Sequence, residues 1–277
     1  MTRGLITIAI GKKYISQAKY LARSAMLNAP HIIRAVITDK PDDLAAYYDF
    51  IIPYNPEYGD PFATKTRLYA YTPFEKTLYM DADSLVINTI DSYWDYLADK
   101  PFVYNGSLIT EGEWYVNIEE TIRRFDVKWL PKFNSGMFLF KKDFITKQIF
   151  ETAYDYLMHQ HERDIAVDFF REKMLPDEPF LAIALAKNNI MPVEDYGRFS
   201  RTLINAEKIH IDVIKRIASF YKNGTFVFPL VVHFCGRLGG SFFLREKVKL
   251  FLYFNSPLHR LTTFFFIFAR NIVKRRT

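Results

Sequence analysis

The sequence predicts an α/β fold in which a single, mainly parallel sheet is flanked by helices. Over about the first eighty residues, short β-branched apolar runs alternate with stretches whose apolar residues recur at helical spacing. Such alternation places helices on both faces of a parallel sheet. The length of 277 residues, of which 49% are hydrophobic, allows a sizeable core, and a charged fraction of 25% is typical of a globular protein.

The expected elements succeed one another regularly in this part of the chain. Strands are expected at residues 5–10, 32–37, 50–52 and 77–80. Helices are expected at residues 14–27, 42–48 and 64–71. Pro41 and Asp42 supply a start signal for the second helix, and Pro73 ends the third. The alternating pattern ends at Asp81.

The later part of the chain carries elements at longer intervals. We expect a strand at 136–140, a helix at 143–159, a short helix at 179–186 and a strand at 226–234. Pro229 inside the last strand indicates an edge position or a bulge, because proline cannot donate a hydrogen bond to a sheet. Residues 105–131 are polar and aromatic, and we expect them to cross one end of the sheet, where acceptor sites often lie.

The positive charge is concentrated at the C-terminal end. Residues 241–277 contain eight lysines and arginines and one acid, Glu246, so this segment alone accounts for the net charge of +6. The rest of the chain is close to neutral, which argues against binding of nucleic acid. The single cysteine, Cys235, forms no internal disulfide and fits a reducing compartment. The short apolar start lacks the length and the cleavage site of a signal peptide.

The charge distribution predicts a domain at residues 1–240 and a basic, aromatic, amphipathic helical tail at 241–277. No run in the tail approaches the roughly 20 apolar residues of a membrane-spanning helix. Aromatic and basic residues of this kind are typical of a helix on an anionic membrane surface, and we favour this interpretation. The alternative is a pair of helices packed on the body. We therefore expect a cytoplasmic protein, peripheral on the cytoplasmic face of a membrane.

Two carboxylates directly follow the strand expected at 77–80. Asp81 and Asp83 are separated by one residue and lie between apolar runs. At the carboxyl end of a parallel strand, where ligands of α/β sheets bind, two hard oxygen ligands can hold a divalent cation that neutralises a diphosphate. In a largely buried setting, two such carboxylates repel each other unless a cation compensates them. A metal site is therefore the favoured interpretation.

The same residues allow one alternative. A strand followed by Asp-x-Asp also occurs in haloacid-dehalogenase-type phosphatases, in which the first aspartate, here Asp81, attacks phosphorus. That scheme needs a later acidic pair for magnesium. Asp177 and Glu178 form such a pair, but no strand is expected before them. A metal-dependent phosphatase remains the alternative function.

Four patches of the sequence occur in an order known from one enzyme family. They are ITIAI at 6–10 with Tyr14 beyond it, TKTRL at 64–68 with KTLYMDADSLV at 76–86, FNSG at 133–136, and VVHFCG at 231–236. Over residues 5–237 the chain resembles the family 8 glycosyltransferases, in particular the glycogenin-like and bacterial glycan-assembling members. The resemblance implies a GT-A fold and a UDP-sugar donor held by Mn²⁺ or Mg²⁺.

The resemblance also implies roles for individual residues. The implied metal ligands are Asp81, Asp83 and His233, whose neutral imidazole suits Mn²⁺ beside two carboxylates. The residues implied to hold the nucleotide sugar are Thr7, Ile8, Ala9, Tyr14, Lys65, Arg67, Asp81, Ala82, Asp83, Asn134, Ser135, Gly136, Gly236 and Arg237. The residues implied in catalysis are Asp177, Glu178, Asn134 and Arg67. Arg67 is the better candidate for the phosphates and Lys65 the second, because a guanidinium pairs with phosphate oxygens in a fixed fork.

Two positions depart from the pattern of the family. Arg237 occupies the stretch in which glycogenin-like enzymes have a lysine that touches the phosphates. The Asp-Gln pair of the family beneath the sugar appears here as Asp177 and Glu178. The family implies retention at the anomeric carbon, with Asp177 positioning the sugar hydroxyls. The carboxylate of Glu178 leaves two other roles open, as the nucleophile of a double displacement or as the general base of an inverting reaction.

The sequence therefore predicts a metal-dependent hexosyltransferase that moves a sugar from a UDP-sugar to a glycan or lipid-linked acceptor. The tail at 241–277 is expected to bring the enzyme to an anionic membrane surface.

Overall fold

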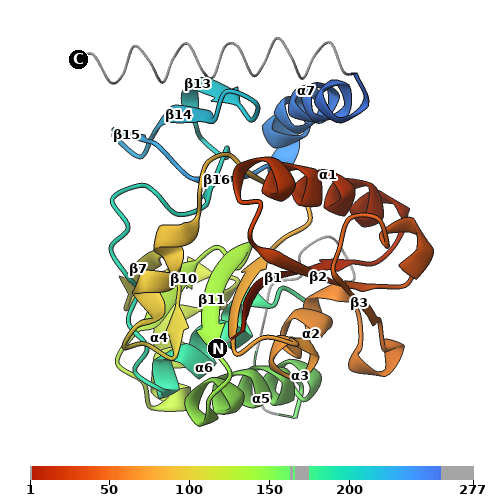
Figure 1. Cartoon of the computed structure of the whole chain (residues 1–277). Coiled ribbons are helices and arrows are strands. Elements are labelled where there is room, and N and C mark those ends of the chain that lie inside the picture. Colours follow the sequence, from red (N-terminus) through yellow and green to blue (C-terminus); the bar gives the residue numbers. More distant parts are fainter. Residues whose placement is uncertain (1, 163–164, 166–174, 257–277) are drawn as a thin grey trace. The chain divides into compact units, whose positions relative to one another are not determined.

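A six-stranded sheet forms the centre of the first of two compact units (Figure 1). The computed structural model describes residues 2–162, 165 and 175–256. The first unit comprises Met1–Ile15, Ile33–Ala82 and Ser92–Asp195, and the second comprises Ser16–Ile32, Asp83–Asp91 and Tyr196–Thr277.

The strands of the large sheet run in the order β3-β2-β1-β4-β11-β6. Their bounds are Arg3–Ala9 for β1, Ile33–Thr38 for β2, Phe50–Pro53 for β3, Lys76–Met80 for β4, Phe102–Val103 for β6 and Met137–Lys141 for β11. β1 is parallel to β2 and β4, and β2 is parallel to β3. β11 is antiparallel to both β4 and β6. The predicted α/β architecture, with a mainly parallel central sheet, is therefore confirmed.

Four helices gather on one side of this sheet (Figure 1). They are α2 Pro61–Lys65, α3 Leu68–Tyr71, α5 Phe144–Met158 and α6 Glu178–Lys187. Between them and the sheet lies an aromatic core in which the Phe102 and Phe138 rings stack at 5.0 Å and Phe140 meets Phe150 at 4.9 Å. Phe138 and Phe140 are two residues apart on β11, so their side chains point to the same face of the sheet, toward this core.

The segment between β6 and β11 forms small elements of its own. They are β7 Gly106–Ile109, β8 Glu113–Trp114, β9 Val116–Asn117, α4 Ile118–Phe125 and β10 Leu130–Phe133. β7 pairs antiparallel with β10, and β8 pairs antiparallel with β9 in a short hairpin whose turn is Tyr115. Among the described residues, 3₁₀ helices also occur elsewhere in the chain, at η1 Pro41–Asp43, η2 Pro56–Tyr58 and η3 Asp91–Leu97.

In its described part, the second unit contains two three-stranded sheets and the helix α7. The strands are β5 Ser84–Val86, β12 Arg201–Thr202, β13 Glu207–Asp212, β14 Ile217–Lys222, β15 Thr225–Val227 and β16 Val231–His233, and α7 is Gly236–Asn255. The later turns of α1, Lys12–Asn28, hold β5 in place. The Val86 amide donates to the Ser24 hydroxyl at 2.9 Å, and the Asn28 amide donates to the Val86 carbonyl at 2.8 Å. These buried bonds position the residues at the start of β5.

A buried carboxylate anchors α7 to the second unit. Glu246 is fully buried, accepts a hydrogen bond from the Val213 amide at 2.9 Å and pairs with Lys249 at 2.9 Å and Arg245 at 3.0 Å. Phe243 and Leu250 on the same helix belong to the apolar core of this unit. The first part of the predicted tail is thus a packed helix whose basic side chains are turned toward internal partners.

Three expected elements differ from the structure. The helix expected at 64–71 is two short helices, α2 and α3, with Thr66 as the C-cap of the first. The strand expected at 226–234 is broken into β15 and β16 around Pro229, which cannot continue a ladder of hydrogen bonds. The helix expected at 42–48 is only the 3₁₀ turn η1 followed by turns.

The predicted domain boundary at residue 240 falls inside α7, because this helix begins at Gly236. Residues 257–277 of the predicted tail lie outside the described residues. Across the part of the chain that the structure describes, no helix combines the length and the apolar character needed to cross a membrane.

Candidate active site

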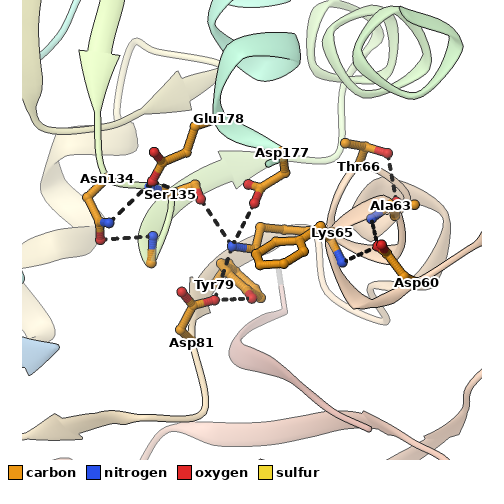
Figure 2. Close-up of polar contacts among 12 residues, drawn as sticks. Asp60, Ala63, Lys65, Thr66, Tyr79, Asp81, Asn134, Ser135, Asp177 and Glu178 are labelled. Carbon is orange, nitrogen blue, oxygen red and sulfur yellow. Dashed lines mark hydrogen bonds and ion pairs between the residues drawn. The ribbon is translucent and has the colours of Figure 1, made fainter. Parts of the chain in front are cut away.

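A buried lysine stands at the centre of a polar cluster in the first unit (Figure 2). Lys65 is the last residue of α2, a five-residue helix whose N-terminus is capped by Asp60 through the amides of Phe62 and Ala63. Only 4% of Lys65 is exposed. The Asp60 cap fixes the start of α2, and with it the backbone that carries the Lys65 side chain.

The ammonium of Lys65 joins three residues that are distant in sequence (Figure 2). Its Nζ lies 3.0 Å from Ser135 Oγ, 3.2 Å from Asp81 Oδ1 and 3.3 Å from Asp177 Oδ1. Tyr79, two residues before Asp81, donates its hydroxyl to the same Asp81 oxygen at 2.5 Å. A buried ammonium needs such partners, because an unpaired buried charge is strongly unfavourable.

The charges in this cluster are unbalanced. Burial acts to lower the pKa of Lys65, but the carboxylates of Asp177, Asp81 and Glu178 outweigh it and the pKa is raised. Burial raises the pKa of Asp177, an effect that the Lys65 ammonium only partly offsets. Asp177 is 1% exposed, and its Oδ2 has no hydrogen-bond partner among the described residues. One cation therefore faces three carboxylates, and one buried acceptor is open for an additional donor.

Glu178 is the first residue of α6 and is held by the loop before β11. Its Oε1 accepts hydrogen bonds from the Ser135 amide at 2.9 Å and the Asn134 side chain at 3.2 Å. Burial raises the pKa of Tyr115, and the charge of Glu178 adds to this effect. Burial, together with the charge of Asp177, raises the pKa of Glu178 to about 7. This carboxyl group can therefore gain or lose a proton near neutral pH.

The Asn-Ser-Gly patch also touches the end of β4. The Asp81 amide donates to the Gly136 carbonyl at 2.9 Å, and the Gly136 amide donates to Asn134 Oδ1 at 3.2 Å within its own loop. Three of the predicted nucleotide-sugar residues thus lie beside Asp81 because β11 pairs with β4.

The three predicted metal ligands form one group. Asp81, Asp83 and His233 each offer one ligand atom, and these atoms lie within 4.8 Å of one another. His233 Nε2 is 3.0 Å from Asp83 Oδ1, and β16 brings the histidine there by pairing antiparallel with β5, so that His233 faces Ser84. Ala82, between the two aspartates, is buried. Two carboxylates and an imidazole at this separation fit a divalent cation such as Mn²⁺.

The first predicted patch lies on β1. Thr7 and Ala9 are fully buried, Ile8 is nearly so, and the Thr7 hydroxyl has no partner among the described residues. β1 is parallel to β4 with Ile6 opposite Tyr79, so the carboxyl ends of the two strands lie side by side. Tyr14, near the start of α1, is partly exposed. This edge is where α/β sheets bind their ligands.

Three further residues of the predicted set are Arg67, Gly236 and Arg237. Arg67 follows α2, and its guanidinium stacks between the rings of Tyr58 at 4.7 Å and Tyr154 at 4.6 Å. The structure thus places Lys65, the second candidate, against Asp81 and gives Arg67 an aromatic environment. Gly236 begins α7 with a positive φ of 79°. The side chain of Arg237 lies outside the described part of the chain.

Two tyrosines of the cluster are absent from the predicted set. Tyr79 lies two residues before Asp81 on one strand, and a hydroxyl at that spacing inside an apolar run is a signal that could have indicated it. Tyr115 has no local signal, because only the folding of the β8–β9 hairpin brings it within electrostatic reach of Glu178.

Comparisons with known proteins agree with the fold. No protein-family model matches the chain, and no curated protein matches its sequence. The galactosyltransferase LgtC, solved with donor and acceptor sugar analogues, is 20% identical with a TM-score of 0.59, over 88% of this chain and 94% of LgtC. An active-site glutamine-to-glutamate variant of LgtC is 19% identical with a TM-score of 0.60, over 88% of this chain and 95% of that one.

A more distant likeness is to the glycosyltransferase GlyE of Streptococcus pneumoniae TIGR4, at 17% identity and a TM-score of 0.45, over 71% of this chain and 46% of GlyE. The order of the strands, the helices that flank them and the likeness to LgtC together assign the chain to the GT-A glycosyltransferase fold.

Proposed function

We propose that the protein is a metal-dependent glycosyltransferase that transfers a hexose from a UDP-sugar to a glycan or lipid-linked acceptor. The observation that carries this proposal is the group of Asp81, Asp83 and His233, whose ligand atoms lie within 4.8 Å of one another at the carboxyl end of a GT-A strand. In LgtC, the same fold was solved with donor and acceptor sugar analogues.

Asp81, Asp83 and His233 are proposed to hold Mn²⁺ or Mg²⁺. The donor set is suited to such an ion, because carboxylate oxygens are hard ligands and a neutral imidazole favours Mn²⁺. When bound, the cation supplies positive charge to the diphosphate of the donor as the sugar departs. Lys65, held against Asp81 at 3.2 Å, adds a fixed positive charge of the protein beside this group.

Asp177 and the loop before β11 are proposed to hold the transferring sugar. The open acceptor at Asp177 Oδ2 is buried, and a sugar hydroxyl is a donor of the right size and chemistry to satisfy it. Asn134 is exposed while its neighbour Ser135 is buried, so its side-chain amide is accessible beside the carboxylates.

We assign the binding of the uridine of the donor to the first sequence patch, ITIAI at 6–10 with Tyr14. Thr7, Ile8, Ala9 and Tyr14 lie at or just beyond the carboxyl end of β1, beside the strand that carries Asp81. Arg67, Gly236 and Arg237 remain proposed contacts to the phosphates.

The role of Glu178 differs between a retaining and an inverting reaction. In a retaining reaction, Asp177 and Glu178 orient the sugar, or Glu178 attacks the anomeric carbon and a second displacement restores the configuration. In an inverting reaction, Glu178 takes the proton of the acceptor hydroxyl as that oxygen forms the new bond. We expect retention of configuration, and anomeric analysis of the product by NMR measures it directly. An inverted linkage would instead make Glu178 a general base.

Calorimetry with a panel of UDP-sugars tests the proposed function. Binding of one UDP-sugar in the presence of Mn²⁺, with loss of binding in chelator, is the expected result. The group of His233 with two aspartates favours this function over the phosphatase, whose cation would depend on Asp177 and Glu178. If no UDP-sugar binds and small phosphoesters release phosphate, the phosphatase is the correct assignment.

We further propose that the C-terminal segment brings the enzyme to an anionic membrane. α7 exposes an apolar stripe at Leu244, Val248, Phe251 and Leu252, on turns whose other side packs in the second unit. Basic and aromatic residues continue through 257–277. A surface of this kind combines apolar insertion with attraction to anionic headgroups.

A chain that ends at residue 256 tests this membrane proposal. Truncation there leaves Phe243, Glu246 and Leu250 in place, whereas truncation at 240 removes them from the core. We expect the shortened protein to keep its thermal unfolding midpoint and to lose most of its sedimentation with vesicles of phosphatidylserine and phosphatidylcholine. Vesicles of phosphatidylcholine alone are the control, and equal binding of both proteins to anionic vesicles contradicts the proposal.

A further inference from the structure

Lys222, the last residue of β14, is a partly buried lysine that pairs with no carboxylate among the described residues. Its Nζ donates to the Thr202 carbonyl at 2.7 Å and to Thr202 Oγ1 at 2.6 Å. Both acceptors are neutral, and an ammonium has three N–H donors, so these two bonds leave one donor for an additional acceptor. A partly buried cation that lacks a counter-ion is stabilised when an anion reaches it.

The surroundings of Lys222 disfavour its charge. Burial lowers the pKa of Lys222, Cys235 opposes this effect, and the charge of Arg201 adds to it. Arg201 and Thr202 are the two residues of β12, so a second cation belongs to the strand that Lys222 contacts. Lys222 therefore has a like charge nearby and no carboxylate paired with it in the described part of the chain.

The contact of Lys222 with Thr202 places the ammonium beside a predicted metal ligand. Thr202 stands directly opposite His233 in the parallel pair of β12 and β16, and His233 stands opposite Ser84 of β5. Side chains of directly opposite residues point to the same face of a sheet, and neighbouring strands are about 4.8 Å apart. The hydroxyl that Lys222 contacts therefore lies next to the imidazole that contacts Asp83 at 3.0 Å. All of these residues belong to the second unit.

We propose that Lys222 binds the diphosphate of the sugar nucleotide, on the His233 side of the metal group. This inference rests on the proposed function, in which Asp81, Asp83 and His233 hold a cation that neutralises the same diphosphate. The remaining N–H of Lys222 supplies a charge-assisted hydrogen bond to a phosphate oxygen, and Thr202 holds the ammonium in place for it. A lysine suits this role because its ammonium is a compact point charge.

A lysine in this position affects the metal and the nucleotide in opposite directions. Its charge repels Mn²⁺ when no nucleotide is present, and it attracts the diphosphate once the metal is bound. A lysine that only fastened β12 to β16, and so positioned His233, would instead support the binding of both. The two roles therefore predict different signs for the change in Mn²⁺ affinity when the lysine is replaced.

The test compares Lys222→Met with Lys215→Met as a matched control. Lys215 is an exposed lysine of the turn before β14, so its replacement makes the same change in net charge. For Lys222→Met we expect the Kd for Mn²⁺ alone, measured by electron paramagnetic resonance, to fall by about twofold to fivefold. The Kd for UDP at saturating Mn²⁺, measured by calorimetry, should rise by about tenfold. Lys222→Arg should restore most of the affinity for UDP, and Lys215→Met should change neither Kd.

Additional variants and probes separate this inference from folding and from the proposed function. Lys222→Gln removes the charge and keeps a donor for Thr202, so it should reproduce both shifts with an unchanged thermal midpoint. If Lys222→Met and Lys222→Gln weaken the binding of Mn²⁺ and UDP together, or change neither, the inference is wrong. If the wild type binds Mn²⁺ but no UDP, the proposed function fails, and inorganic pyrophosphate then tests Lys222 by itself. Mn²⁺-dependent binding of pyrophosphate that weakens in Lys222→Met supports the inference, and equal binding overturns it.

Discussion

Replacement of Asp83 with alanine is expected to abolish Mn²⁺-dependent binding of the UDP-sugar and to lower transfer by about a thousandfold. Asp83 offers one of three ligand atoms in the group with Asp81 and His233. Without it, the two remaining ligands hold the cation weakly, and the charge that develops on the diphosphate loses its main compensation. Calorimetry and initial rates with and without Mn²⁺ measure both losses.

The loss in Asp83→Ala should not reflect misfolding. In the absence of metal the variant is relieved of repulsion between the two carboxylates but also loses the contact of Asp83 with His233, so its thermal midpoint should stay close to that of the wild type. Added Mn²⁺ should stabilise the wild type by mass action, by about 2.7 kcal/mol at a hundredfold excess over Kd, and should leave the variant unchanged. Asp42→Ala, which alters an exposed aspartate of η1, is the control. Metal-dependent binding that survives in Asp83→Ala rules out the proposed ligand set.

Replacement of Lys65 with methionine is expected to lower the free energy of unfolding by about 3 kcal/mol or more. The side chains of Lys65 and Asp177 are 5% and 2% exposed, so water cannot solvate the carboxylate that loses its partner. Asp81 is 25% exposed, and its share of the loss is smaller because solvent screens it. Urea denaturation measures the difference.

The loss should depend on pH in a defined direction. Burial already raises the pKa of Asp177, and removal of the Lys65 cation raises it further, so the variant gains most from protonation. The deficit against wild type should therefore be larger at about pH 8 than at about pH 5. Lys147→Met is the matched control, because its pair with Glu151 is 51% and 57% exposed and should matter by less than about 1 kcal/mol. Equal deficits for the two lysines contradict the central role of Lys65.

Much of the fold was predictable because local pattern and long-range order agree in the first eighty residues. β1, β2 and β4 are short, apolar and largely buried runs, and β3 is a shorter apolar run that is partly exposed, so all four are visible in the sequence. The points at which an expected element is divided were harder to predict from the sequence. The division of residues 64–71 into α2 and α3 depends on how Thr66 and Arg67 meet their neighbours, and helical periodicity alone does not report that.

The candidate site was predictable only in part, for a similar reason. Asp81 and Asp83 are separated by one residue and follow a strand, so their chemistry is visible in one motif. Lys65 and Asp177 are far apart in the chain, and their ion pair exists because α2 and α6 cover the same side of one sheet. Arg67 was preferred over Lys65 as the contact to the phosphates because of the chemistry of its guanidinium. The direction in which each side chain points depends instead on where the five-residue helix α2 ends.

The sequence by itself determined the α/β class, the carboxylate pair at the end of β4 and the concentration of positive charge after residue 240, because each is a property of neighbouring residues. Only the tertiary structure decided that Lys65 meets Asp81 and Asp177 and that His233 joins the two aspartates. These contacts depend on strand pairing and helix packing between distant segments. A charge or hydroxyl acquires its chemical role there only when burial removes water and leaves these partners as its surroundings.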